Sequence, residues 1–83
     1  MSNYCITFRS VTLAQRGERA LAREGQHCTV ARTPRWMEER GCGYCLRLRG
    51  SAWRAALAIL DRAGVEYRKV YRLAGEKGEE VPV

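Results

Sequence analysis

Two stretches of the chain alternate apolar and polar residues with a period of two. Every second position is apolar from Tyr4 to Phe8, and again from Tyr44 to Leu48. This alternation is typical of a β-strand that buries one face. The two stretches align with each other and open two copies of an internal repeat, in which a strand is followed by a helical pattern, a glycine and a second strand.

The helical pattern of each copy has recognisable ends. In the second copy, apolar residues recur at helical spacing and form one stripe, made of Trp53, Ala56, Leu57 and Leu60. We expect Ser10 and Ser51 to be N-caps, and Gly25 and Gly64 to follow the last helical residues. Gly17, inside the first helix, costs about 1 kcal/mol relative to alanine unless it allows close packing on the sheet.

Second strands near Cys28–Ala31 and Glu66–Arg72 complete the repeat. The order β-α-β-β-α-β predicts an α+β fold of the ferredoxin-like βαββαβ type. Right-handed crossovers then place the first and third strands side by side in a four-stranded antiparallel sheet, with two helices on one face. We expect a single domain over residues 1–73 and a flexible tail over residues 74–83.

Length and charge narrow the classes of function. The chain has 83 residues, enough for one domain, and a net charge of +6 from 15 basic and 9 acidic residues. The positive charge favours anionic partners. No apolar run is long enough to span a membrane, and the first residues lack the pattern of a secretion signal. We therefore expect a cytoplasmic protein that does not enter membranes.

The face of the sheet away from the helices has an unusual composition. Side-chain alternation assigns it Cys5, Thr7, Arg9, Cys45, Arg47 and Arg49. Cys5 and Cys45 occupy equivalent positions of the repeat on adjacent strands, so we expect them to be close. The simplest interpretation is that they are packing residues beneath a homodimer interface on this open face.

Cys42 and Cys45 form a CxxC motif, and Cys42 is the candidate reactive thiol. Gly41 and Gly43 flank it and reduce steric cover. Nearby arginines favour its thiolate and are candidates for binding the substrate: Arg35, Arg40 and Arg47. Four thiolates from two chains could bind zinc, but His27 is the chain's single histidine, and we assign no metal site and no cofactor.

The run Thr33-Pro34-Arg35, followed by a short loop and Cys42-Gly43, resembles the selenium/sulfur carrier-like family of small bacterial and archaeal proteins. The resemblance extends over residues 4–73. It implies a cytoplasmic protein whose Cys42 holds sulfur or selenium as a persulfide or selenosulfide, with donor and acceptor proteins as partners. Cys45 departs from the family pattern and could act as a resolving thiol.

Two alternatives remain open at this point. A basic ferredoxin-like sheet could bind nucleic acid, but Tyr4 and Tyr44 fall on the core side, where they could not stack on bases. A regulatory module that dimerises through its open face also fits, without thiol chemistry. Nothing in the sequence supplies a general base or a nucleotide-binding loop, so we expect a carrier or binding protein and not a complete enzyme.

Overall fold

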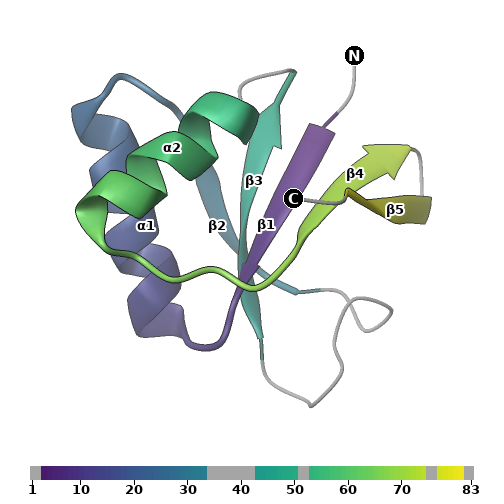
Figure 1. Ribbon diagram of the computed structural model, residues 1–83. Helices are drawn as coiled ribbons and strands as arrows, with labels where there is room; N and C mark the ends of the chain where they lie inside the picture. Colours follow the sequence, from purple (N-terminus) through teal and green to yellow (C-terminus); the bar gives the residue numbers. More distant parts are fainter. Residues whose placement is uncertain (1–2, 34–42, 51–52, 75–76, 82–83) are drawn as a thin grey trace.

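The computed structural model describes residues 3–33, 43–50, 53–74 and 77–81. In these residues the chain forms two helices and five strands, shown in Figure 1. In chain order they are β1 (Asn3–Phe8), α1 (Val11–Arg23), β2 (Thr29–Arg32), β3 (Tyr44–Arg49), α2 (Trp53–Ala63), β4 (Val70–Ala74) and β5 (Lys77–Val81). The α+β class is confirmed. Arg35, Arg40, Cys42 and Ser51 lie outside the described residues.

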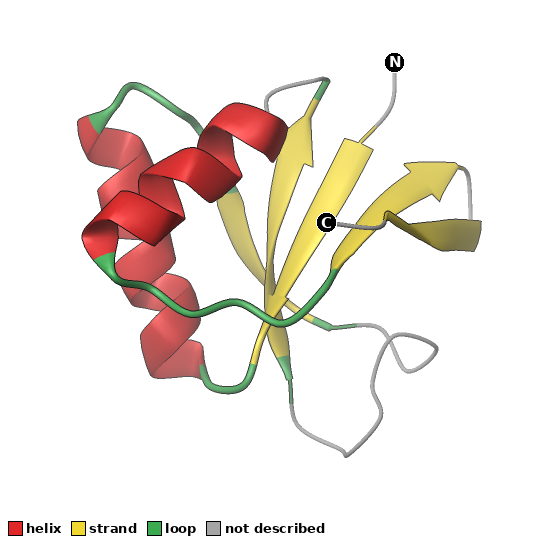
Figure 2. Cartoon of the chain, viewed as in Figure 1, coloured by secondary structure: helices red, strands yellow, loops and turns green. Residues whose placement is uncertain are grey.

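The strands form one antiparallel sheet in the order β2-β3-β1-β4-β5. β1 and β3 are neighbours, as expected from the repeat, with Asn3 opposite Arg49 and Phe8 opposite Tyr44. The two helices cover one face of this sheet, as Figure 2 shows in red and yellow. The prediction of a four-stranded sheet is wrong, because β5 adds a fifth strand at the edge beside β4. The ferredoxin-like type stays a prediction.

β5 lies within residues 74–83, which the sequence predicts to be a flexible tail. It pairs with β4, and Arg72 lies opposite Glu79 and forms an ion pair with it. A second ion pair joins Lys69 Nζ to Glu80 Oε1 at 3.6 Å. Cross-strand pairs of opposite charge add roughly 0.2–1 kcal/mol each to a sheet. Contacts with β4, and not the local sequence, therefore account for the strand.

The fourth strand begins later than predicted, at Val70 instead of Glu66. Thr7 of β1 is the reason. The backbone of Thr7 forms hydrogen bonds with two consecutive residues: Thr7 N–H donates to Lys69 O, and Arg68 N–H donates to Thr7 O, each at 2.8 Å. Its hydroxyl accepts a hydrogen bond from Lys69 N–H at 3.0 Å. A side chain thus replaces a backbone carbonyl in the ladder, and regular pairing starts only at Val70.

The structure confirms the predicted helix ends at Ser10, Gly25 and Gly64. Ser10 is the N-cap of α1, and its Oγ accepts a hydrogen bond from Leu13 N–H at 3.2 Å. Gly25 and Gly64 follow α1 and α2 with φ of 77° and 70°. Glycine adopts this left-handed backbone without the penalty that a Cβ brings.

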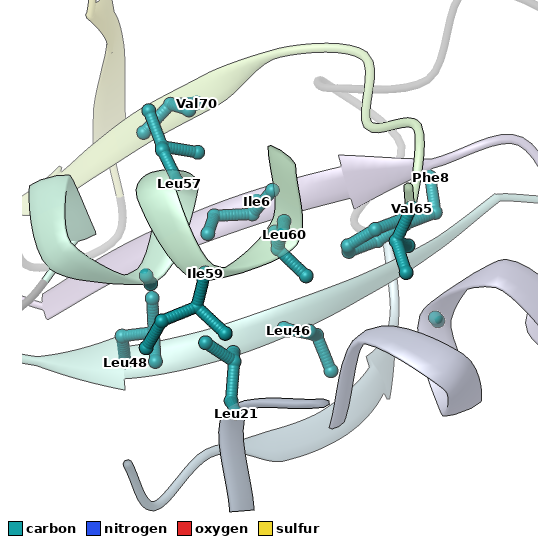
Figure 3. Packing of buried hydrophobic residues seen from close by; sticks show 12 residues of the cluster. Ile6, Phe8, Leu21, Leu46, Leu48, Leu57, Ile59, Leu60, Val65 and Val70 are labelled. Atoms are coloured by element: carbon teal, nitrogen blue, oxygen red, sulfur yellow. The ribbon is translucent and has the colours of Figure 1, made fainter. Parts of the chain in front are cut away.

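The main core lies between the helices and the sheet (Figure 3). β1 and β3 contribute alternate residues to it, including Ile6, Phe8, Leu46 and Leu48, all at most 2% exposed. The α2 stripe packs against them, with Leu60 fully buried. The alternation seen in the sequence therefore places one apolar face of each strand under the helices.

Gly17 allows α1 to approach this core closely. A Cβ at this position would lie 3.1 Å from Leu46 Cδ1 and 3.2 Å from both Leu60 Cδ2 and Phe8 Cζ. These three neighbours are themselves buried, so they have little room to move. The close packing that would justify a glycine inside a helix is present.

We expect Gly17→Val to lower the free energy of unfolding by about 1–3 kcal/mol, the usual cost of overpacking a core. Urea denaturation followed by circular dichroism measures it. Ala22→Val is the control for adding the same side chain to an exposed position of the same helix. Valine is a better helix former than glycine, so a loss of stability in Gly17→Val comes from overpacking and not from helix propensity. A Gly17→Val protein as stable as the wild type would show that α1 does not pack closely at Gly17.

Candidate functional site

A hydrogen bond joins Thr33 and Gly43, the residues on either side of the segment that contains Cys42. Thr33 N–H donates to Gly43 O at 3.0 Å. A Cβ at position 43 would lie 3.2 Å from Thr33 Oγ1, so glycine permits this close approach. This hydrogen bond lies at the start of β3. Gly43, one of its two residues, directly follows Cys42 in the chain.

Cys5 and Cys45 lie close together on the face of the sheet away from the helices. Cys5 is opposite Arg47, and Cys45 is opposite Thr7, so the two cysteines occupy diagonal positions on neighbouring strands. They pack together with Tyr71 of β4. Each cysteine is 1% exposed within a single chain, so their burial does not require the homodimer that the sequence suggested, which stays a prediction.

A hydrogen bond between the two thiols makes them chemically unequal. It raises the pKa of Cys5, and burial raises it further. The same hydrogen bond lowers the pKa of Cys45. Arg47 adds a favourable charge for the Cys45 thiolate. Because the two thiols titrate as a pair, loss of the first proton leaves the negative charge on Cys45.

The Thr33 hydroxyl completes the surroundings of Cys45. Thr33 is 6% exposed, and within the described part of the chain its Oγ1 has no hydrogen-bond partner. It lies near enough to Cys45 to contribute to the lowered pKa of that thiol. A buried hydroxyl without a partner is costly, and donation to a thiolate on Cys45 would remove that cost.

Arg47 connects this buried pair with the surface. Its side chain is exposed, and it lines a shallow hollow of about 300 Å³ together with Asn3, Thr29 and Arg49. The hollow combines two guanidinium groups with an amide and a hydroxyl. Of the three predicted substrate-binding arginines, the structure therefore places Arg47 beside the thiol pair, while Arg35 and Arg40 lie outside the described residues.

Comparison with known families decides the relationship. The family described as "Putative Se/S carrier protein-like" matches residues 3–72. The chain belongs to this family. Searches among curated proteins and solved structures find no match to the chain. The match includes both β1 and β3, and with them the Thr33–Gly43 contact of this Se/S carrier-like protein.

Two residues that surround the cysteine pair were not identified from the sequence. Thr33 belongs to the Thr-Pro-Arg run, but nothing in the sequence shows that its hydroxyl lies beside Cys45. Tyr71 covers the cysteine pair. It could have been found from its alternation with Leu73, had the start of β4 been placed correctly.

The alternation of Cys28 with Val30 in the sequence predicts that Cys28 is a buried residue of the second strand, and this prediction is wrong. β2 begins at Thr29, so Cys28 precedes the strand and is only partly buried, against the main core. Burial raises the pKa of its thiol to about 11, and the carboxylate of Glu18 contributes in the same direction. The raised pKa keeps the thiol protonated at neutral pH. This, and not complete burial, limits the reactivity of Cys28.

We expect the alkylation rate of Cys28 to rise with an apparent pKa near 11, well above the ordinary ~8.5 of a thiol. Iodoacetamide labelling over a pH series, followed by peptide mapping, measures it. The same chain in urea is the control, and there the value should return to the ordinary range. An ordinary value in the folded protein would contradict the placement of Cys28 against the core.

The aromatic residues bear on the nucleic-acid alternative. Tyr4 and Tyr44 pack against the main core, and Tyr4 stacks on Trp53 of α2 with ring centroids 5.4 Å apart. On the opposite face of the described strands the aromatic residue is Tyr71, which is 8% exposed. Base stacking requires exposed rings, so this fold gives that alternative no support.

In the described ranges, no three or more His, Cys, Asp or Glu side chains are grouped to hold a metal ion. None of the helices in those ranges is both long and apolar enough to cross a membrane.

Proposed function

We propose that this member of the Se/S carrier-like family carries sulfur or selenium on Cys42, as a persulfide or selenosulfide, and passes it on in the cytoplasm. Its partners are a donor protein that loads the atom and an acceptor that receives it. The protein is then a carrier and not a complete enzyme. The family match over residues 3–72 supports this proposal.

Loading is a transfer between sulfur atoms. The Cys42 thiolate attacks the terminal sulfur of a donor persulfide, a new S–S bond forms on Cys42, and the donor leaves as a thiolate. No external oxidant is needed, since the donor persulfide already carries the sulfur in its transferable state. Selenium follows the same course from a donor selenosulfide.

The Thr33–Gly43 hydrogen bond is the observation that carries this proposal. It joins the Thr-Pro-Arg and Cys-Gly parts of the family pattern at the beginning of β3. Arg47 lies on the same strand and is exposed. We assign Arg35, Arg40 and Arg47 to holding the anionic terminal chalcogen, because guanidinium groups bind anions through several donors.

Cys45 is proposed as the thiol that releases the carried atom. Its thiolate attacks Cys42 Sγ, forms a Cys42–Cys45 disulfide and expels the terminal sulfur as hydrosulfide. The hydrogen bond from Cys5, the charge of Arg47 and the Thr33 hydroxyl all lower the pKa of Cys45 and favour this nucleophile. Its position on β3, the strand that follows Cys42 in the chain, suits attack on a group of the same chain.

The proposal predicts that Cys42 is the most reactive thiol at neutral pH, with an apparent pKa below the ordinary ~8.5. Alkylation over a pH series measures this. Cys42 and Cys45 share the tryptic peptide 41–47, so fragment ions must assign the label. Cys28 is the internal control. If Cys42 reacts no faster than Cys28, or its apparent pKa is at or above the ordinary value, the carrier mechanism loses its physical basis.

A further inference from the structure

The hydrogen-bonded pair Cys5–Cys45 has the properties of a site in its own right. Both are free thiols, each is 1% exposed, and they come from the two central, directly paired strands β1 and β3. The buried Thr33 hydroxyl, without a partner in the described ranges, lies near Cys45. Packing alone would need neither a second sulfur nor this hydroxyl.

We propose that Cys5 and Cys45 form a two-electron redox site, separate from Cys42, which a low-molecular-weight or protein disulfide oxidises to an internal Cys5–Cys45 disulfide. The pair is a dithiol in the reduced protein. Its oxidation cross-links the two central strands of the sheet.

The reaction proceeds in two exchange steps. The Cys45 thiolate attacks one sulfur of the oxidising disulfide, which gives a mixed disulfide on Cys45 and releases one thiolate. Cys5 then loses its proton and attacks Cys45 Sγ, which forms the internal disulfide and releases the second thiolate. Two protein thiols are oxidised, one disulfide is reduced to two thiols, and the protons of Cys5 and Cys45 pass to the released thiolates.

The positions of the two cysteines indicate that this bond is easily reduced. A disulfide needs Cα atoms about 4.4–6.8 Å apart and tolerates deviation only with strain, whereas diagonal neighbours in a sheet lie about 7–8 Å apart. β1 and β3 must therefore shift slightly to close the bond. On reduction, Cys45 is the better leaving group, since the Thr33 hydroxyl and Arg47 stabilise its thiolate.

One consequence rests on the proposed function. If Cys45 releases hydrosulfide from a persulfide on Cys42, Cys5 can attack Cys45 of the resulting disulfide and return Cys42 to its thiol. Two thiols and one persulfide then become one buried disulfide, one free Cys42 thiol and one hydrogen sulfide. Cys42 is ready for reloading, and an external dithiol restores the pair.

The test uses the full chain with Cys28→Ala and Cys42→Ala, which leaves Cys5 and Cys45. The variant is equilibrated in a series of glutathione buffers from fully reduced to fully oxidised, quenched with acid, unfolded and alkylated. We expect intact mass to pass from two alkylated thiols to a species lacking two hydrogens and accepting no label. The outcome is independent of whether Cys42 carries a chalcogen. The redox proposal can therefore fail while the proposed carrier function stands, and the carrier function can fail while the redox proposal stands.

The matched control carries Cys42→Ala and Cys45→Ala, and keeps Cys5 and Cys28. It also has two thiols, but Cys28 packs against the main core on the helix side of the sheet and Cys5 lies on the other side. We expect it to form no internal disulfide. Two free thiols or two glutathione adducts in the Cys5/Cys45 variant across the whole series would overturn the proposal. Should that variant not fold, a disulfide between peptides 1–9 and 41–47 in the Cys42→Ala protein decides the same question.

Discussion

Replacing Phe8 with alanine is expected to lower the free energy of unfolding by about 3–5 kcal/mol, a large share of the ~5–15 kcal/mol that holds a typical domain together. Phe8 is 1% exposed at the end of β1. Its ring lies under α1, where it is one of the three groups that a Cβ on Gly17 would meet. The cavity left by the ring borders both a helix and the sheet, so it cannot collapse without moving one of them.

Thermal and urea denaturation of the Phe8→Ala variant measure this loss. Arg19→Ala is the control, because Arg19 is exposed on α1 and should change stability by less than about 0.5 kcal/mol. A Phe8→Ala free energy of unfolding within about 1 kcal/mol of the wild-type value would contradict the core described for this domain. No neighbouring side chain is expected to fill the space that the ring leaves.

Replacing Cys45 with alanine is expected to reduce the release of hydrosulfide from the loaded protein at least about tenfold, while Cys42 still accepts sulfur. The chemical reason is that Cys45 is the nucleophile proposed to expel the carried atom. A tenfold change in rate corresponds to about 1.4 kcal/mol in the activation barrier. The hydrogen bond from Cys5, Arg47 and Thr33 all favour its thiolate.

Hydrosulfide released after loading with a persulfide donor measures this effect, and the mass of the loaded protein reports acceptance separately. Cys28→Ala is the control, since Cys28 lies on the other side of the sheet from Cys45 and should leave release unchanged. Release at the wild-type rate from Cys45→Ala protein would remove Cys45 from the mechanism. If the Cys45→Ala protein no longer accepted sulfur, Cys45 would instead be assigned to the loading step.

Local patterns in the sequence were sufficient for much of the fold. The alternation in β1 and β3 placed Ile6 and Leu46 under the helices, and the repeat brought Cys5 and Cys45 to neighbouring strands. Ser10 and Gly25 marked the ends of α1 because capping depends on a few adjacent residues. The alternation and the caps are determined within one element, and the neighbouring positions of Cys5 and Cys45 follow from the equivalence of the two repeats.

Features that depend on distant contacts could not be predicted in the same way. β5 has no alternating apolar pattern, and its pairing with β4, including the Arg72–Glu79 ion pair, supplies its order. The start of β4 depends on the hydroxyl of Thr7, which is remote in sequence. The nearness of Thr33 to Cys45 likewise requires β2 and β3 to be paired.

The most direct test of the central claim is to find where a transferred atom resides. The Cys45→Ala protein, which lacks the thiol proposed to release the carried atom, is incubated with a persulfide donor, freed of excess donor without reductant, and analysed by intact mass and by fragmentation of peptide 41–47. We expect one added sulfur, located on Cys42, and none on a Cys42→Ala/Cys45→Ala protein treated alongside. Addition that persists in the Cys42→Ala/Cys45→Ala variant, or that maps to Cys28 in the Cys45→Ala protein, would contradict the assignment of Cys42 as the carrier residue.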